Sequence, residues 1–221
     1  MEHVQRAVEA RCLIVTSVEA ELEAVKRGIG DNERFRIIVG GVGQAAAAAS
    51  TAAALALGHY ERVINMGIGG GFRGAADIGT IVVASEIVAA DLGAESADGF
   101  MLIDELGFGS ARMMIDESAS RQVAAALNAK GFAAAYAPIL TVSTVTGTAN
   151  TAEALSARIP GAAAEAMEGY GVAAAAKLMK VPVMEIRGIS NAVGPRDRDA
   201  WRIKDALQAL EAAGAALTEV I

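Results

Sequence analysis

The stretch AEAMEGYGVAAAAKLMKVPVMEIRGISNAVGPRD, residues 164–197, decides how the rest of the chain is interpreted. It indicates a strand end, a helix of small residues, an apolar strand and then a polar loop. Glu168 lies at the start of the helix, and Asn191 follows the apolar strand. A carboxylate in such an apolar setting needs a partner, because an unpaired buried charge is costly. A pair of ligand hydroxyls, a nearby arginine or the helix N-terminus could each be that partner.

The length and composition suit a cytoplasmic protein with one domain, residues 1–221. Hydrophobic residues make up 53% of the 221 residues, largely as alanine, and this length can bury a substantial core. The Ala-rich run 45–57 is too short to span a bilayer. Charged residues such as Glu2 and Arg6 occupy the N-terminus instead of an apolar signal segment. We therefore expect no membrane partner.

Charge and residue counts exclude several kinds of site. A net charge of −7 argues against a nucleic-acid partner, which requires a basic surface. Cys12 is the only cysteine, so we expect a small core residue and no internal disulfide. His3 and His59 are the only histidines, and without a Cys cluster we expect no metal site.

Apolar strands alternate with helices along the chain, a pattern typical of an α/β protein. We expect a three-layer α/β/α domain with a central mixed sheet. Strands are predicted at 11–17, 35–39, 62–66, 80–90, 133–137, 139–145, 162–166 and 181–190. Helices are predicted at 18–26, 44–57, 117–130, 150–158 and 168–179, and after residue 198 to about 218. Asn150 and Thr151 are candidate caps, and 91–115 is undecided apart from one more short strand.

Two glycine-rich segments, GGVGQ at 40–44 and GIGGG at 67–71, are predicted to be loops at the carboxyl ends of strands. Ligands of α/β sheets bind at those ends. Neither segment is a dinucleotide fingerprint, because Ala46 and Phe72 stand where the third glycine is required, and no Walker lysine follows. We therefore expect no cofactor. Tight turns and close approach to a ligand both remain open.

Together these segments resemble the nucleoside phosphorylase and nucleosidase superfamily, in particular its methylthioadenosine nucleosidase-like branch. The resemblance covers nearly the whole chain, from Cys12 to about Trp201. It rests on SVEAE (17–21), GGVGQA (40–45), NMGIGGG (65–71), GTIVV (79–83), AME (166–168) and RGISN (187–191).

Within that branch, two segments are most similar to the futalosine hydrolase family. They are TVSTVTGT (141–148) and GISNAVGPRD (188–197). That family cleaves hypoxanthine from a nucleoside intermediate of a menaquinone pathway. The resemblance implies a purine nucleosidase that acts on a small-molecule nucleoside and forms a homo-oligomer, with a dimer favoured.

The resemblance also implies roles for particular residues. The catalytic pair would be Glu21, which activates the attacking water, and Asn191, which meets the purine. The implied substrate-binding residues are Gly69 and Gly70 on the ribose and water side, Met167 and Glu168 at the ribose, Ser190 at the purine, and Arg187.

The chemistry of these residue types agrees with glycosidic cleavage, which passes through an oxocarbenium-like cation. Glu21 could position and deprotonate water, although Glu19 and Glu23 are acids of the same helix and only the strand end favours Glu21. Glu168 could accept hydrogen bonds from two vicinal hydroxyls. For Met167, simple core packing is an alternative to a sugar contact.

Asn191 is informative because the adenine-cleaving relatives carry an aspartate there. Its NH₂ can donate to a 6-keto oxygen while its carbonyl accepts from a protonated N7. This pattern suits hypoxanthine and mismatches adenine, so we predict a 6-oxopurine substrate. Water or Asp197 could supply the N7 proton. The alternative is that Asn191 is a turn residue at a strand end.

Acidic residues at 19 and 21 favour water over phosphate as the nucleophile, because they repel a phosphate dianion. Arg73 could still pair with an anion. In the loop 194–202, Arg196, Arg198, Trp201 and Arg202 could contact the aromatic carboxylate of a 5′-substituent, or form a solvated loop paired with Asp197 and Asp199.

Two other functions remain open at this stage. One is a methylthioadenosine or adenosylhomocysteine nucleosidase, which would release adenine. The other is a purine-nucleoside sensor that binds without cleaving.

Overall fold

The computed structural model describes residues 11–97 and 99–221; the expectations about the N-terminal residues Glu2, His3 and Arg6 lie outside this range. Its centre is an eight-stranded mixed sheet in the order β10-β4-β8-β9-β3-β1-β2, with β7 on β4. The strands are β1 (Cys12–Thr16), β2 (Phe35–Val39), β3 (Arg62–Gly71), β4 (Ile81–Ala89), β5 (Gly93–Ser96), β6 (Gly99–Leu102), β7 (Arg112–Met113), β8 (Ala134–Thr141), β9 (Ala164–Ala166) and β10 (Val183–Ala192). The helices are α1 (Glu19–Ile29), α2 (Gln44–Leu57), α3 (Ile103–Leu106), α4 (Glu117–Ala129), α5 (Ala149–Arg158), α6 (Gly169–Leu178) and α7 (Ile203–Val220).

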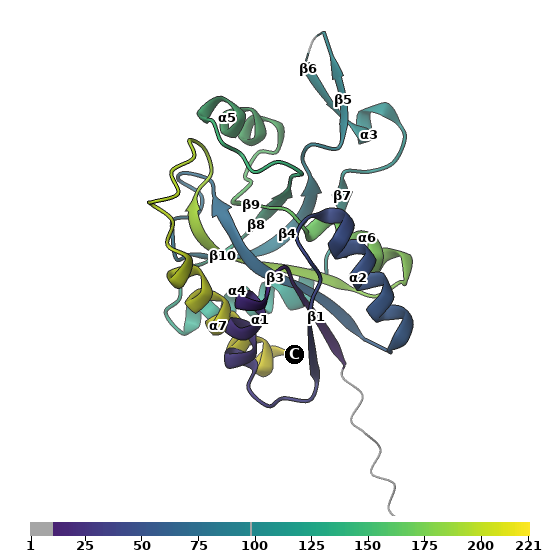
Figure 1. Cartoon of the computed structure of the whole chain (residues 1–221), viewed down its shortest axis with the longest axis vertical. Coiled ribbons are helices and arrows are strands. Elements are labelled where there is room, and N and C mark those ends of the chain that lie inside the picture. Colours follow the sequence, from purple (N-terminus) through teal and green to yellow (C-terminus); the bar gives the residue numbers. More distant parts are fainter. Residues whose placement is uncertain (1–10, 98) are drawn as a thin grey trace, which may run out of the picture.

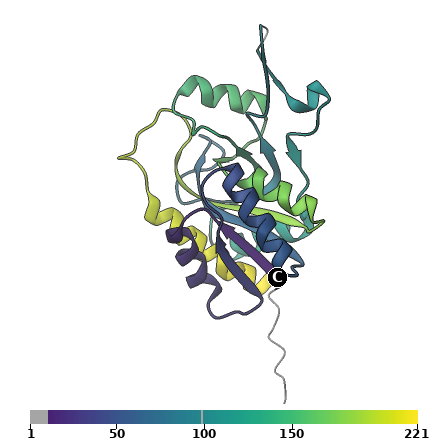
Figure 2. The same ribbon diagram turned by 45° about the vertical axis from the view of Figure 1, so that its right-hand side comes forward.

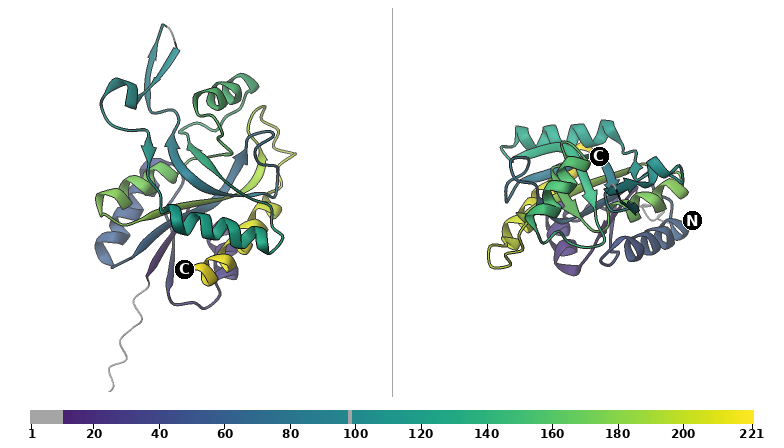
Figure 3. Two further views of the ribbon diagram at one scale, coloured as in Figure 1. Left: turned by 180° about the vertical axis from the view of Figure 1, so that it is seen from behind. Right: turned by 90° about the horizontal axis from the view of Figure 1, so that it is seen from above.

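Helices cover both faces of the sheet, which confirms the predicted three-layer arrangement. On one face α1 and α7 pack together, and the view from behind shows α4 beside α7 (Figure 3). On the other face α2 lies along α6 (Figures 1 and 2). The apolar strands are buried between these layers because both of their faces are covered. Cys12 belongs to this core, with a 2% exposed side chain, as predicted.

Small residues let helices α2 and α6 approach closely. Gly171 of α6 faces the start of α2, where an added Cβ would lie 2.2 Å from the carbonyl oxygen of Gln44. No side chain fits at that distance, so the glycine is required by packing. This contact places the start of α6, and with it Glu168, beside the turn that precedes α2.

The five strands β10, β4, β8, β9 and β3 close into a ring, because β10 pairs with β3 as well as with β4. The pairs β3–β10, β4–β8 and β8–β9 are parallel, whereas β3–β9 and β4–β10 are antiparallel. This closure brings the carboxyl-terminal parts of β3 and β10 together beside β9, at one end of the ring. The predicted site residues lie at this end of the ring.

Several local expectations were wrong. The segment 67–71 is not a loop: β3 continues through it and pairs with β10 and, at its last two residues, with β9. Pairing with β10, and with β9 on the other side at Gly70 and Gly71, holds these glycines extended although they lack side chains. The helix at 149–158 is capped by Thr148, whose hydroxyl accepts from the backbone N–H of Thr151, and not by Asn150 or Thr151.

Two further expectations concern loops and membranes. The segment 40–44 is a turn as predicted, with positive φ at Gly41 and Gly43. Residues 91–115 contain more structure than expected: the hairpin β5–β6 and helix α3 project from the body of the molecule (Figure 1).

Within residues 11–97 and 99–221, the helices lack the length and apolarity needed to cross a membrane.

Candidate active site

A cavity of about 330 Å³ lies where β1, β3, β9 and β10 end. Of the predicted site residues, seven line it together, although they are spread over 170 positions of the sequence. These are Glu21, Gly69, Gly70, Met167, Glu168, Ser190 and Asn191. The eighth, Arg187, is fully buried and is not among the lining residues.

Glu21 is held in place by backbone N–H groups, although it belongs to the first turn of α1. One carboxylate oxygen accepts from Ser17 at 2.8 Å and Val18 at 3.3 Å, and the other accepts from Ile68 at 2.9 Å. Its side chain is 3% exposed, while Glu19 and Glu23 are on the solvent side of the helix. The structure therefore separates the three acids that the sequence could not.

Glu168 lies across the cavity, at the N-terminus of α6. One of its carboxylate oxygens accepts from the backbone N–H of Gly43 at 3.1 Å, and the other from that of Met167 at 3.3 Å. The second oxygen also lies 3.3 Å from Nη1 of Arg187. The arginine partner considered from the sequence is thus present, and the same carboxylate still faces the cavity.

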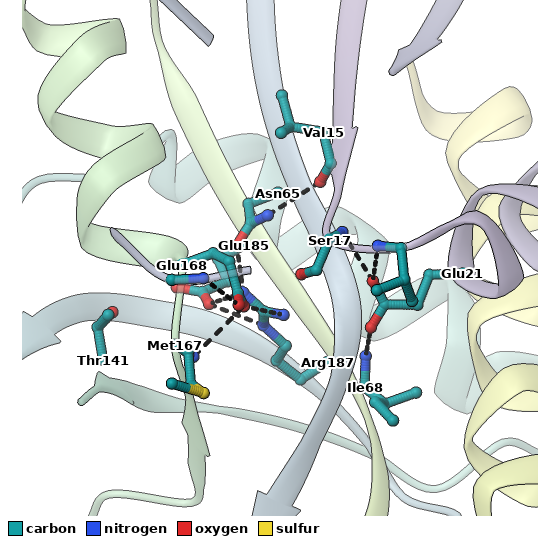
Figure 4. A network of polar contacts seen from close by, with 12 residues as sticks. Val15, Ser17, Glu21, Asn65, Ile68, Thr141, Met167, Glu168, Glu185 and Arg187 are labelled. Atoms are coloured by element: carbon teal, nitrogen blue, oxygen red, sulfur yellow. Dashed lines mark hydrogen bonds and ion pairs between the residues drawn. The ribbon is translucent and has the colours of Figure 1, made fainter. Parts of the chain in front are cut away.

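Arg187 forms the centre of a buried charged cluster behind the cavity (Figure 4). Its Nε donates to Glu185 at 2.9 Å, and its Nη2 donates to the side-chain oxygen of Asn65. Burial alone would lower the pKa of Arg187, but the charges of Glu185, Glu168 and Glu21 raise it. Burial raises the pKa of Glu185 to about 6, against the opposing effect of Arg187. One guanidinium therefore faces three carboxyl groups.

The end of this cluster meets Glu21 above the backbone of Gly67. A Cβ added there would lie 2.5 Å from Nη1 of Arg187 and 2.8 Å from Oε1 of Glu21. Glycine is required at this position because two functional side chains occupy the space over it. Within the described residues, Nη1 of Arg187 forms the ion pair with Glu168 and makes no hydrogen bond. A donor and a carboxylate thus converge on the same small volume.

Asn191 lies in β10. The prediction that it belongs to the loop after this strand was wrong. Its side-chain oxygen accepts from the Ser190 hydroxyl at 2.8 Å, and its Nδ2 donates to the carbonyl of Ala192 at 3.1 Å. The amide lies over Gly70, where an added Cβ would be 3.3 Å from Nδ2. The orientation of this amide is therefore fixed, with one N–H of Nδ2 still available to a ligand.

Two buried acids of the site, Glu165 and Glu185, were not predicted from the sequence. Glu165, 5% exposed, lines the cavity and accepts from the backbone N–H of Thr146 at 2.9 Å and from its hydroxyl. It was interpreted only as part of a short strand. A signal existed for Glu185, because Glu185 and Arg187 are two residues apart in a strand and so share a face.

The loop 194–202 contributes little to the cavity. Only Trp201 lines it, and the guanidinium of Arg196 lies 5.6 Å from the centre of the Trp201 ring. Arg202 pairs with Asp205 at 3.1 Å and not with Asp197 or Asp199. Asp197 is exposed and accepts from the backbone N–H of Asp199, so it does not line the cavity as an N7 proton donor would.

Arg73, the residue that left phosphate binding open, is exposed and faces a separate hollow beside α5. The described part of the main cavity is lined by no lysine or arginine. This lining offers no cation to hold a phosphate dianion.

The sequence and the fold were compared with known proteins. Residues 8–221 match the model of the phosphorylase superfamily. The futalosine hydrolase of Streptomyces coelicolor is 46% identical, over 95% of this chain and 95% of that protein. The futalosine hydrolase of Acidothermus cellulolyticus is 49% identical, over 93% of this chain and 89% of that protein.

Solved structures share the fold at much lower identity. A futalosine hydrolase of Helicobacter pylori has a TM-score of 0.82 at 16% identity, covering 96% of this chain and 99% of that one. The methylthioadenosine/adenosylhomocysteine nucleosidase of Neisseria meningitidis, in complex with methylthio-immucillin-A, has a TM-score of 0.82 at 16% identity, covering 96% of this chain and all of the other. This chain belongs to the phosphorylase superfamily and, within it, to the futalosine hydrolase family.

Proposed function

We propose that this protein hydrolyses the N-glycosidic bond of futalosine and releases hypoxanthine. The observation that carries the proposal is the convergence of Glu21, Glu168 and Asn191 on one cavity. The identity of 46–49% to futalosine hydrolases, over nearly the full length, supports the substrate.

Glu21 is the general base in this proposal. Three backbone N–H groups fix its carboxylate, and the oxygen that accepts from Ile68 has a further lone pair to accept from a water. Nη1 of Arg187, which is buried behind the cavity and lies over Gly67 close to the same carboxylate, places a positive charge beside Glu21. The water is thereby aimed at the anomeric carbon, and proton transfer to Glu21 accompanies its attack.

Glu168 binds the ribose in this proposal, accepting from its 2′- and 3′-hydroxyls, while Met167 packs against the sugar. The carboxyl groups of Glu21, Glu168 and Glu185 outnumber the charge of Arg187. The resulting negative potential favours the oxocarbenium-like state, in which positive charge develops on the ribose.

Asn191 reads the base, with its Nδ2 donating to the 6-oxo oxygen. The Ser190 hydroxyl holds the amide so that this N–H faces the ligand. Gly69 and Gly70 allow the backbone of Glu165 and the side chain of Val193 to lie close to β3, which brings both residues to the cavity. Water is the nucleophile in this proposal, since the described lining of the cavity contains no lysine or arginine to hold phosphate.

The proposal is tested by chromatography of the products after incubation of the protein, without phosphate, with futalosine, inosine, adenosine and methylthioadenosine. Hypoxanthine released from futalosine is the expected result. Adenine released from methylthioadenosine would instead identify an adenine nucleosidase. Tight binding of a nucleoside without any release of base would identify a sensor.

A homodimer is part of the proposal. Leu57 on α2 and Leu178 on α6 are 84% and 75% exposed, and these neighbouring helices offer an apolar surface for a second copy. Light scattering after gel filtration should give twice the mass of the chain, and a monomer mass would contradict this part.

A further inference from the structure

Three residues form one row across the sheet at the floor of the cavity. Gly70 of β3 pairs with Glu165 of β9 on one side and with Asn191 of β10 on the other. Directly paired residues of neighbouring strands present their side chains on the same face. Glu165 and Asn191 therefore flank Gly70. The side chain of Val193 covers this glycine, since a Cβ added at Gly70 would lie 2.9 Å from Cγ2 of Val193, and a flat ring could lie on Val193 between the two polar residues.

The carboxyl group of Glu165 is held in the cavity wall. One oxygen accepts from the backbone N–H of Thr146 at 2.9 Å, and the other accepts from the Thr146 hydroxyl. Burial raises the pKa of Glu165, and the two bonds from Thr146 oppose that rise. Each oxygen has one further lone pair, so the group can accept from a ligand.

A carboxylate that only supported the 145–148 loop would have no need to face the cavity. Glu165 and Thr146 both line it, together with Asn191. Asn191 presents an N–H donor there, and Glu165 presents an acceptor. One bound ring could therefore accept a hydrogen bond from Asn191 and donate one to Glu165.

We propose that Glu165 is a second base-reading residue, which accepts a hydrogen bond from the N1–H of a 6-oxopurine. This inference rests on the proposed function, because it requires the base to occupy the row over Gly70. A 6-oxopurine carries a hydrogen on N1 and an acceptor at position 6, which match Glu165 and Asn191 respectively. Adenine has a lone pair on N1, and the Glu165 carboxylate repels it.

The test measures binding of free bases by calorimetry, which needs no turnover. The unmodified protein should bind hypoxanthine about 10- to 100-fold more tightly than 1-deazahypoxanthine, in which C–H replaces N1–H. Glu165→Gln should lose most of this difference, while adenine binds no more weakly than before. Glu153→Gln, the same change at an exposed position on α5, should leave all three affinities unchanged.

Two results would overturn the inference. Equal affinity of the unmodified protein for hypoxanthine and 1-deazahypoxanthine would show that N1–H is not read, whether or not the variant folds. If Glu165→Gln weakens the binding of hypoxanthine and the binding of adenine equally, Glu165 only supports the 145–148 loop.

Failure of the proposed function gives a different pattern. Selective hypoxanthine binding through Glu165, without release of base from futalosine, would refute hydrolysis and support the base-reading role.

Discussion

The two ends of the cavity are held in different ways. At the end proposed for the sugar, Glu21 and Glu168 accept hydrogen bonds from backbone N–H groups. At the end proposed for the base, Asn191 accepts from the Ser190 hydroxyl, and Glu165 accepts from the Thr146 hydroxyl as well as from one backbone N–H. Backbone donors persist through any substitution except proline, whereas a hydroxyl is lost with a single one. The fold thus fixes the reacting end, and exchangeable side chains set the base preference.

The two ends also differ in charge. Behind the sugar end, Arg187 and Glu185 are fully buried and form an ionic cluster with Glu168. At the base end, the described lining of the cavity contains one carboxyl group, that of Glu165. The strongest electrostatic effects on turnover are therefore expected at the sugar end, and the effects on selectivity at the base end.

The largest effect is expected for Glu21→Gln. An amide cannot take a proton from water, so kcat should fall by about 10²- to 10⁴-fold, while nucleoside affinity measured by calorimetry changes little. Glu19→Gln, on the solvent side of the same helix turn, is the matched control and should retain full turnover. Retained turnover in Glu21→Gln would remove Glu21 from the mechanism.

Glu168→Gln should have the next largest effect. Loss of the charged acceptor for the ribose hydroxyls should lower kcat/KM for futalosine by about 10- to 100-fold. The variant should bind inosine more weakly than the unmodified protein does. It should bind 2′,3′-dideoxyinosine about as tightly as the unmodified protein does, because this nucleoside lacks both hydroxyls. If dideoxyinosine binding weakens as much as inosine binding, Glu168 acts only through the cluster.

Glu185→Gln tests the charge cluster through stability. The pKa of Glu185 is raised from 4.5 to about 6, so the folded state favours the protonated carboxyl. This contribution to stability is present below pH 4.5 and is lost as the pH rises to 6. Relative to the variant, the free energy of unfolding of the unmodified protein should fall by about 2 kcal/mol between pH 4.5 and pH 7. Urea unfolding at several pH values measures it, and a pH-independent difference would refute the raised pKa.

Asn191→Asp should give the smallest effect and confine it to selectivity. Relative kcat/KM for adenine and hypoxanthine nucleosides should shift about tenfold toward adenine, because the aspartate loses the donor for the 6-oxo oxygen. An unaltered ratio of released bases would show that Asn191 does not read the base.

Some parts of the fold could be predicted from the sequence, and others could not. The apolar runs at β1 and β10 and the helix formers of α1 and α2 determine the layers, because burial on both faces leaves a clear pattern. The glycines at 67–71 carry no such pattern. Their extended conformation comes from pairing with β9 and β10, which are about 100 residues away in the chain.

At the site, sequence motifs predicted residues of both ends, including Ser190 and Asn191 at the base end, and the structure gathers seven of the eight around one cavity. Glu165 could not be found in this way, because its partner Thr146 is 19 residues away and its own segment is too short to show a period. Arg187 was expected to bind substrate, and its position behind Glu168 depends on the closure of β10 onto β3.

The most direct test of the central claim is hydrolysis of futalosine in H₂¹⁸O, with and without phosphate, followed by mass spectrometry of the sugar product. Attack by water held by Glu21 predicts one ¹⁸O in the sugar product and the same rate in both buffers. A sugar 1-phosphate without ¹⁸O, formed only when phosphate is present, would contradict the account.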